Sequence, residues 1–166
     1  MPNDPIAGRF VQLSDSDFNQ ISWHDCHIWG ISFRVGEPSE GDWTSELLLD
    51  IDFICEWCCE NEEGRFRVAP ATLVFHGVAS LAIAIRYAES TLAYPLPIAE
   101  ISRLATNPHK PASSEQDYRW CISLASPSEG EITFTALGFK QALKAAPVLI
   151  DEQCLRLDAR EKLLGR

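Results

Sequence analysis

Two-residue alternation of apolar and polar side chains runs through most of this chain and limits what it can fold into. In residues 45–59, for example, Leu47 and Leu49 fall on one face of an extended chain, and Asp50 and Asp52 fall on the other. Successive side chains of a β-strand point to opposite faces, so the pattern predicts half-buried strands. We predict about seven strands, at residues 22–35, 45–59, 71–78, 80–87, 98–104, 118–125 and 130–138.

The connections between these segments are too short for the crossover helices that parallel neighbours need, so antiparallel pairing is expected. The fold is therefore predicted to be mainly β: a strongly curved antiparallel sheet, a sandwich or a partly open barrel. Residues 138–146 are expected to form a short turn of helix. A C-terminal helix is expected over residues 157–165, with Asp158 as N-cap and Glu161 completing a capping box.

The length of the chain, 166 residues, fits one β-rich domain over residues 1–166, with residues 1–17 and 151–166 peripheral. No basic stretch followed by an apolar run opens the chain, and no window approaches a membrane span of about 20 apolar residues. We therefore expect a cytoplasmic protein. Its cysteines are unevenly spaced, so six free thiols are expected: Cys26, Cys55, Cys58, Cys59, Cys121 and Cys154.

The net charge of −10 is concentrated in residues 37–63, which contain ten acidic residues and no Lys or Arg. Such a surface repels nucleic acid and anionic membranes and attracts a basic protein or a cation. The acidic residues could instead serve only solubility. The residues expected to bind a basic partner are Glu37, Glu40, Asp42, Glu60, Glu62 and Glu63, with Trp43 as an aromatic anchor.

The stretch SWHDCHIWGISF (residues 22–33) combines histidine, aspartate and cysteine and so raises the question of a metal site. On a strand, however, His24 and His27 point to opposite faces and cannot chelate one ion together. We expect no metal and no cofactor. Instead, Trp23, His27 and Trp29 are predicted to share a buried face on which Asp25 hydrogen-bonds His27 or a nearby backbone N–H. His24 is predicted to lie on a solvated face.

The pair Asp50 and Asp52 could perform acid–base chemistry or bind a hard cation. We favour a solvated outer face on which Glu46, Asp50, Asp52 and Glu56 pair with Arg34, Arg86 or Arg119. The alternative is a small metal- or carboxylate-dependent enzyme with a site around His24, Asp50 and Asp52. The CEWCC stretch (residues 55–59) follows a strand pattern among glutamates, which disfavours a redox role. Because no nucleotide-binding or acyl-transfer motif is present, a non-enzymatic protein is favoured.

Three blocks carry a resemblance: SWHDCHIWGISF, ELLLDIDFICEW and VAPATLVFHGV, which follow one another within residues 22–78. They resemble a family of small uncharacterised bacterial proteins, a domain of unknown function. The resemblance implies a bacterial cytoplasmic protein and assigns no catalytic residue. The His-Asp opener and the LVFHGV strand are more loosely similar to β-rich bacterial immunity proteins, which block a toxin by binding it.

Overall fold

The computed structural model describes residues 12–60, 63–87, 95–107, 109 and 115–166. Nearly all its regular structure is β-strand, as the alternating pattern predicted. The strands are β1 (Gln12–Ser14), β2 (His27–Val35), β3 (Ser45–Glu60), β4 (Glu63–His76), β5 (Ala79–Ala84), β6 (Leu96–Ala105), β7 (Tyr118–Leu124), β8 (Glu131–Ala136), β9 (Gly138–Leu143) and β10 (Val148–Ile150). The helices are η1 (Asp15–Gln20), η2 (Pro38–Glu40) and α1 (Leu157–Leu163).

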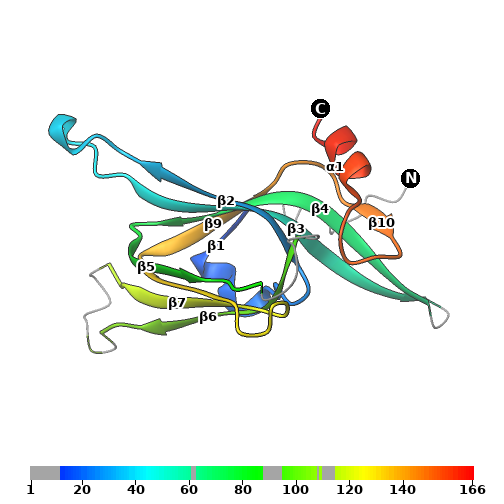
Figure 1. Cartoon of the computed structure of the whole chain (residues 1–166), viewed down its shortest axis with the longest axis horizontal. Coiled ribbons are helices and arrows are strands. Elements are labelled where there is room, and N and C mark those ends of the chain that lie inside the picture. The colour runs from blue at the N-terminus through cyan, green and yellow to red at the C-terminus, as the bar shows by residue number, and fades with distance from the viewer. Residues whose placement is uncertain (1–11, 61–62, 88–94, 108, 110–114) are drawn as a thin grey trace.

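All the strand pairs are antiparallel, and the sheet order is β1-β9-β4-β3-β2-β6-β7-β8-β5, with β10 paired to β4. The predicted mainly β, antiparallel fold with a short C-terminal helix is therefore confirmed. In the part of the chain that the structure describes, the sheet has ten strands rather than about seven. The order is an open path that ends at β1 and β5, so the sheet is not closed into a barrel (Figure 1).

The sheet folds over on itself at the β2–β6 pairing, which spans only His27 and Ile28. Aromatic side chains from the two halves then meet in one core. Phe75 of β4 contacts Phe134 of β8 and Trp120 of β7, with ring centroids 4.8 and 5.0 Å apart. All three rings are at most 2 % exposed, so they form part of the buried core.

Two predictions about helices are wrong. Residues 138–143 form strand β9, because Phe139 and Gln141 alternate inward and both are fully buried. Alternation with a period of two overrode the weak helical pattern of this segment. The helix α1 forms, but its N-cap is Arg156, and Asp158 lies inside the first turn.

The WHDCH segment also departs from prediction. Asp25 has a φ of 62°, which turns the chain and delays the start of β2 to His27. Trp23 is buried and donates a 2.8 Å hydrogen bond to Gln141, so it does not share a strand face with His27. The predicted Asp25–His27 hydrogen bond is wrong, because the Asp25 carboxylate accepts one from Gln153 Nε2 at 2.8 Å.

Candidate functional site

The turn between β2 and β3 carries the first group of predicted binding residues at the tip of a hairpin that projects from the body (Figure 1). We call residues 37–43 the hairpin tip. The Glu37 carboxylate accepts hydrogen bonds from the Ser39 N–H and hydroxyl, at 3.2 and 2.6 Å. Asp42 accepts one from the Thr44 N–H at 2.9 Å. Hydrogen bonding by the Ser39 hydroxyl and N–H lowers the pKa of Glu37, and hydrogen bonding by the Thr44 side chain and N–H lowers the pKa of Asp42, so both carry charge at neutral pH.

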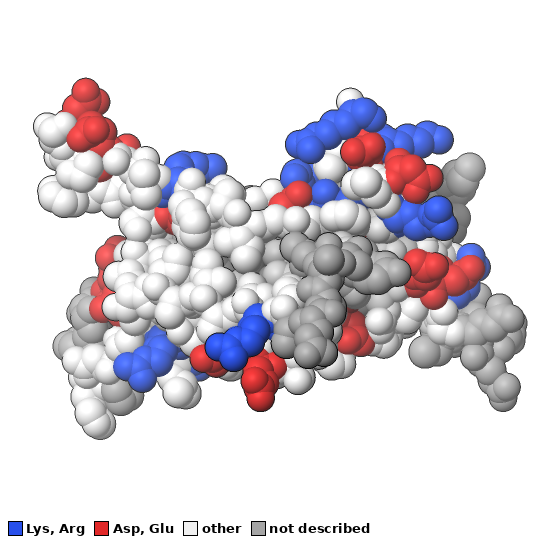
Figure 2. Space-filling model, viewed as in Figure 1, with Lys and Arg blue, Asp and Glu red and all other residues white. Residues whose placement is uncertain are grey.

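The charge of the hairpin tip is not neutralised. Among the described residues, no Lys, Arg or His forms an ion pair with Glu37, Glu40 or Asp42. The nearest base in the sequence, Arg34, is engaged with Glu46 at 2.7 Å. Figure 2 shows acidic side chains at the end of the projecting hairpin with no basic side chain beside them on this face.

Large apolar side chains are exposed along the same hairpin. Trp43 at the tip is 77 % exposed, and Phe33 and Val35 on β2 are 57 and 77 % exposed. Indoles that are exposed in the free protein commonly anchor protein interfaces. The hairpin therefore combines negative charge that has no cationic partner among the described residues with exposed apolar side chains.

The remaining predicted binding residues lie at the other end of the molecule. The β3–β4 hairpin ends with Glu60 opposite Glu63, far from the hairpin tip (Figure 1). The side chains of Glu60 and Glu63, and the whole of Glu62, lie outside the described residues. The acidic segment therefore does not form one surface, because the length of β3 separates the hairpin tip from Glu60.

Asp50 and Asp52 lie at the root of the β2–β3 hairpin, where they bind Arg160 of α1. Asp52 Oδ1 accepts from Arg160 Nε at 2.8 Å, and Asp52 Oδ2 accepts from the Leu155 N–H at 2.9 Å. Asp50 Oδ1 accepts from Arg160 at 2.7 Å and from Lys144 at 3.1 Å. We call Asp50, Asp52, Lys144 and Arg160 the root cluster.

The prediction that Asp52 lies on a solvated face is wrong, because Asp52 is fully buried. Of the basic residues predicted to neutralise this row, Arg34 pairs with Glu46. In the described part of the chain, Arg86 and Arg119 form no ion pair with any acidic residue of this row. The C-terminal segment, which was expected to be peripheral, instead returns over the sheet and buries Leu155 and Arg160.

Within the root cluster, the surroundings of Asp50 favour the charged form of its carboxylate. Partial burial raises the pKa of Asp50, but hydrogen bonds from Arg160 and Lys144 outweigh it, and the pKa lies below its ordinary value. The neighbouring Cys154 thiol lies 3.5 Å from Asp52 Oδ2. Burial, and then the charge of Asp52, raise the pKa of Cys154 to about 12, so the thiol is a poor nucleophile at neutral pH.

His24 does not join the two aspartates. Its Nδ1 lies 2.9 Å from the Ala99 carbonyl oxygen, and its Nε2 lies 3.5 Å from Asp25 Oδ2. The side chain is 60 % exposed, as predicted for this position. The histidine that faces Asp52 across the β2–β3 ladder is His27, whose pKa is lowered mainly by burial.

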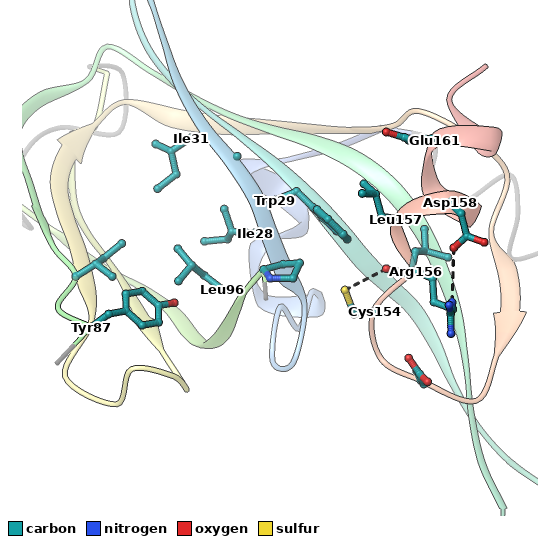
Figure 3. Close-up of a pocket in the computed structure, with 15 residues that line it drawn as sticks. Ile28, Trp29, Ile31, Tyr87, Leu96, Cys154, Arg156, Leu157, Asp158 and Glu161 are labelled. Carbon is teal, nitrogen blue, oxygen red and sulfur yellow. Dashed lines mark hydrogen bonds and ion pairs between the residues drawn. The ribbon is translucent and has the colours of Figure 1, made fainter. Parts of the chain in front are cut away.

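A cleft of about 1340 Å³ lies between β2, the C-terminal segment and a third group of residues: Ile85, Tyr87, Pro95 and Leu96. Figure 3 shows Ile28, Ile31, Tyr87 and Leu96 on one side of β2, with Trp29 and the C-terminal segment on the other. The charged lining residues come from the C-terminal segment: Glu152, Arg156, Asp158 and Glu161. The cleft is therefore lined by apolar residues of β2 and by the charged residues of the C-terminal segment.

Comparison with models of known families, with curated proteins and with solved structures finds no match for the chain. No helix in the described ranges has both the length and the apolar character needed to cross a membrane. Within those same ranges, no group of three or more His, Cys, Asp or Glu side chains could hold a metal ion. Cys26, Cys55, Cys58, Cys121 and Cys154 are free thiols, and the Cys59 side chain lies outside the described residues.

Proposed function

We propose that this chain is a non-enzymatic, cytoplasmic binding protein whose hairpin tip docks a basic protein. The observation that carries the proposal is the hairpin tip itself: Glu37, Glu40 and Asp42 have no cationic partner among the described residues, and they flank an exposed Trp43. Complementary charge steers a basic partner to such a surface, and burial of the indole then supplies affinity.

A basic protein fits this surface better than nucleic acid or an anionic membrane. Phosphates and acidic head groups are repelled by a chain of net charge −10. The looser similarity to bacterial immunity proteins is compatible with the proposal, since such proteins act by binding a toxin.

The enzyme alternative around His24, Asp50 and Asp52 has less support. Both aspartates already accept hydrogen bonds from Arg160, and Asp50 also accepts one from Lys144. The lowered pKa of Asp50 makes that carboxylate a weaker general base than a free one. His24 is directed to Ala99 and Asp25, so the three residues do not share one set of contacts.

The test compares two variants with equal net charge. Glu37→Gln, Glu40→Gln and Asp42→Asn together neutralise the hairpin tip. Glu100→Gln, Glu129→Gln and Glu131→Gln together remove the same charge from exposed positions on other strands and turns. The probe is a fluorescein-labelled decalysine peptide, and its affinity is measured by fluorescence anisotropy at low and high salt.

The hairpin-tip variant should weaken binding of the decalysine peptide by about fivefold or more, and the control variant should weaken it much less. Wild-type binding should also fall as salt rises. Equal losses in the two variants would mean that net charge, and not the hairpin tip, attracts the probe, and the proposal would then fail.

A further inference from the structure

Strand β2 has a long edge that is unpaired in the described part of the chain. On one side it pairs with β3 from His27 to Val35. On the other side it pairs with β6 only at His27 and Ile28. Residues 30–35 therefore carry an open edge, and residues 32–35 are exposed. Unpaired backbone groups on such an edge are a template for another strand.

The backbone groups that face this open edge can be identified from the ladder. Gly36 donates its N–H to the Thr44 carbonyl, so these two residues form a hydrogen-bonded pair. Hydrogen-bonded and non-hydrogen-bonded pairs alternate along an antiparallel ladder. Ser32 and Arg34 are therefore turned toward β3. Ile31, Phe33 and Val35 direct their N–H and C=O groups outward.

The two strands at the ends of the sheet order, β1 and β5, are poorer templates than β2. Strand β1 has three residues. Strand β5 has six, and its ladder is interrupted near Ser80, which has a φ of 53°. Short or irregular edges resist the addition of a strand. The open part of β2 contains no proline, and its Phe33 and Val35 side chains are exposed.

The open edge is continuous with the cleft and the hairpin tip. Gly30 and Ile31 line the cleft at one end of the edge, as Figure 3 shows for Ile31. The acidic hairpin tip follows Val35 at the other end. An extended peptide on this edge would meet apolar walls near Ile31 and negative charge beyond Val35.

We propose that residues 30–35 of β2 accept an extended segment of the basic partner as an additional strand, with its basic residues at the hairpin tip and its apolar residues at the cleft. The inference rests on the proposed function and adds the mode of binding. A second copy of this chain fits the edge less well, because each copy would bring a net charge of −10 and an acidic hairpin tip.

The test uses a fluorescein-labelled peptide of sequence KTKTVFV and the same peptide methylated at every interior backbone nitrogen. Methylation preserves the charge and side chains but removes the N–H donors that a strand needs. The full chain is titrated as wild type, Phe33→Pro and Phe33→Ala. Proline at this outward position removes an N–H that the β2–β3 ladder does not use, and Phe33→Ala controls for the side chain. Equal urea midpoints for the two variants establish that both fold.

Wild type should bind the unmethylated peptide about tenfold more tightly than the methylated one. Phe33→Pro should abolish that difference, and Phe33→Ala should retain it. Equal binding of the two peptides by wild type overturns strand addition, whatever the variants do. If the hairpin-tip variant then still binds both peptides more weakly than wild type does, the proposed function survives. A concentration-dependent dimer that Phe33→Pro abolishes in sedimentation velocity would assign the edge to a second copy and overturn the proposal.

Discussion

The hairpin tip and the root cluster lie on the same β2–β3 hairpin and use the same kind of side chain in opposite ways. At the tip, Glu37 accepts hydrogen bonds from Ser39, and Asp42 accepts one from Thr44, so the partners belong to the same turn. At the root, Asp52 is buried against Arg160, which is 108 residues later in the chain. A carboxylate on a sheet therefore becomes structural when a later segment returns to cover it. One that is left uncovered remains available to a partner.

The largest expected effect is at the root. Replacement of Arg160 by Met leaves the Asp52 charge buried without its guanidinium partner, because Asp52 is 0 % exposed. The free energy of unfolding should fall by about 3–5 kcal/mol, measured by urea denaturation. Arg156→Met, at an exposed pair with Asp158, is the matched control and should change it by less than about 0.5 kcal/mol. Similar losses of unfolding free energy in both variants would show that burial of the Arg160–Asp52 pair does not set its contribution to stability.

A smaller effect is expected at Asp50, whose contribution to the free energy of unfolding should depend on pH. The pKa of Asp50 in the folded chain lies below its ordinary value, so the Asp50 carboxylate contributes stability above that ordinary value. This contribution is lost as the pH falls through the lower, folded-state pKa. The stability difference between wild type and Asp50→Asn should therefore shrink on acidification from about pH 6 to pH 3.

The measurement for Asp50 is the urea midpoint of both proteins at several pH values. Glu129→Gln, at an exposed turn, serves as the control and should follow the wild-type curve. A difference between wild type and Asp50→Asn that stays constant over this range would contradict the assigned role of the carboxylate charge.

The smallest effect on stability is expected at the hairpin tip. Trp43 is 77 % exposed, so Trp43→Ala should change the free energy of unfolding by less than about 0.5 kcal/mol in urea denaturation. Trp120→Ala is the contrasting variant, because that indole is fully buried, and it should cost about 3–5 kcal/mol. A loss above 1 kcal/mol for Trp43→Ala would show that the tip indole belongs to the fold and is not a free anchor.

The sequence predicted the class of fold because two-residue alternation depends only on local geometry. Leu47, Leu49 and Ile51 are all fully buried, as their spacing required. The same rule failed at Asp25, because a single residue at positive φ ends the alternation. The rule also holds for residues 138–143, where a short turn of helix was expected and strand β9 forms instead.

The sites were harder to predict than the fold. The hairpin tip could be recognised, because its charge and its Trp43 are contiguous in sequence. The root cluster could not, because Lys144 and Arg160 reach Asp50 only through tertiary packing. The open edge of β2 depends on where β6 stops pairing, and this is a property of the folded sheet.

The most direct test of the central claim measures binding and stability together in two variants. One neutralises the hairpin tip (Glu37→Gln, Glu40→Gln and Asp42→Asn), and the other neutralises the root with Asp50→Asn. Affinity for the labelled decalysine peptide and the urea midpoint are measured for each under conditions in which both proteins are folded. The hairpin-tip variant should lose affinity and keep its midpoint, whereas Asp50→Asn should lower the midpoint and keep the affinity. If the hairpin-tip variant binds the peptide as wild type does, or if Asp50→Asn weakens binding as much, the division between a binding tip and a structural root is contradicted.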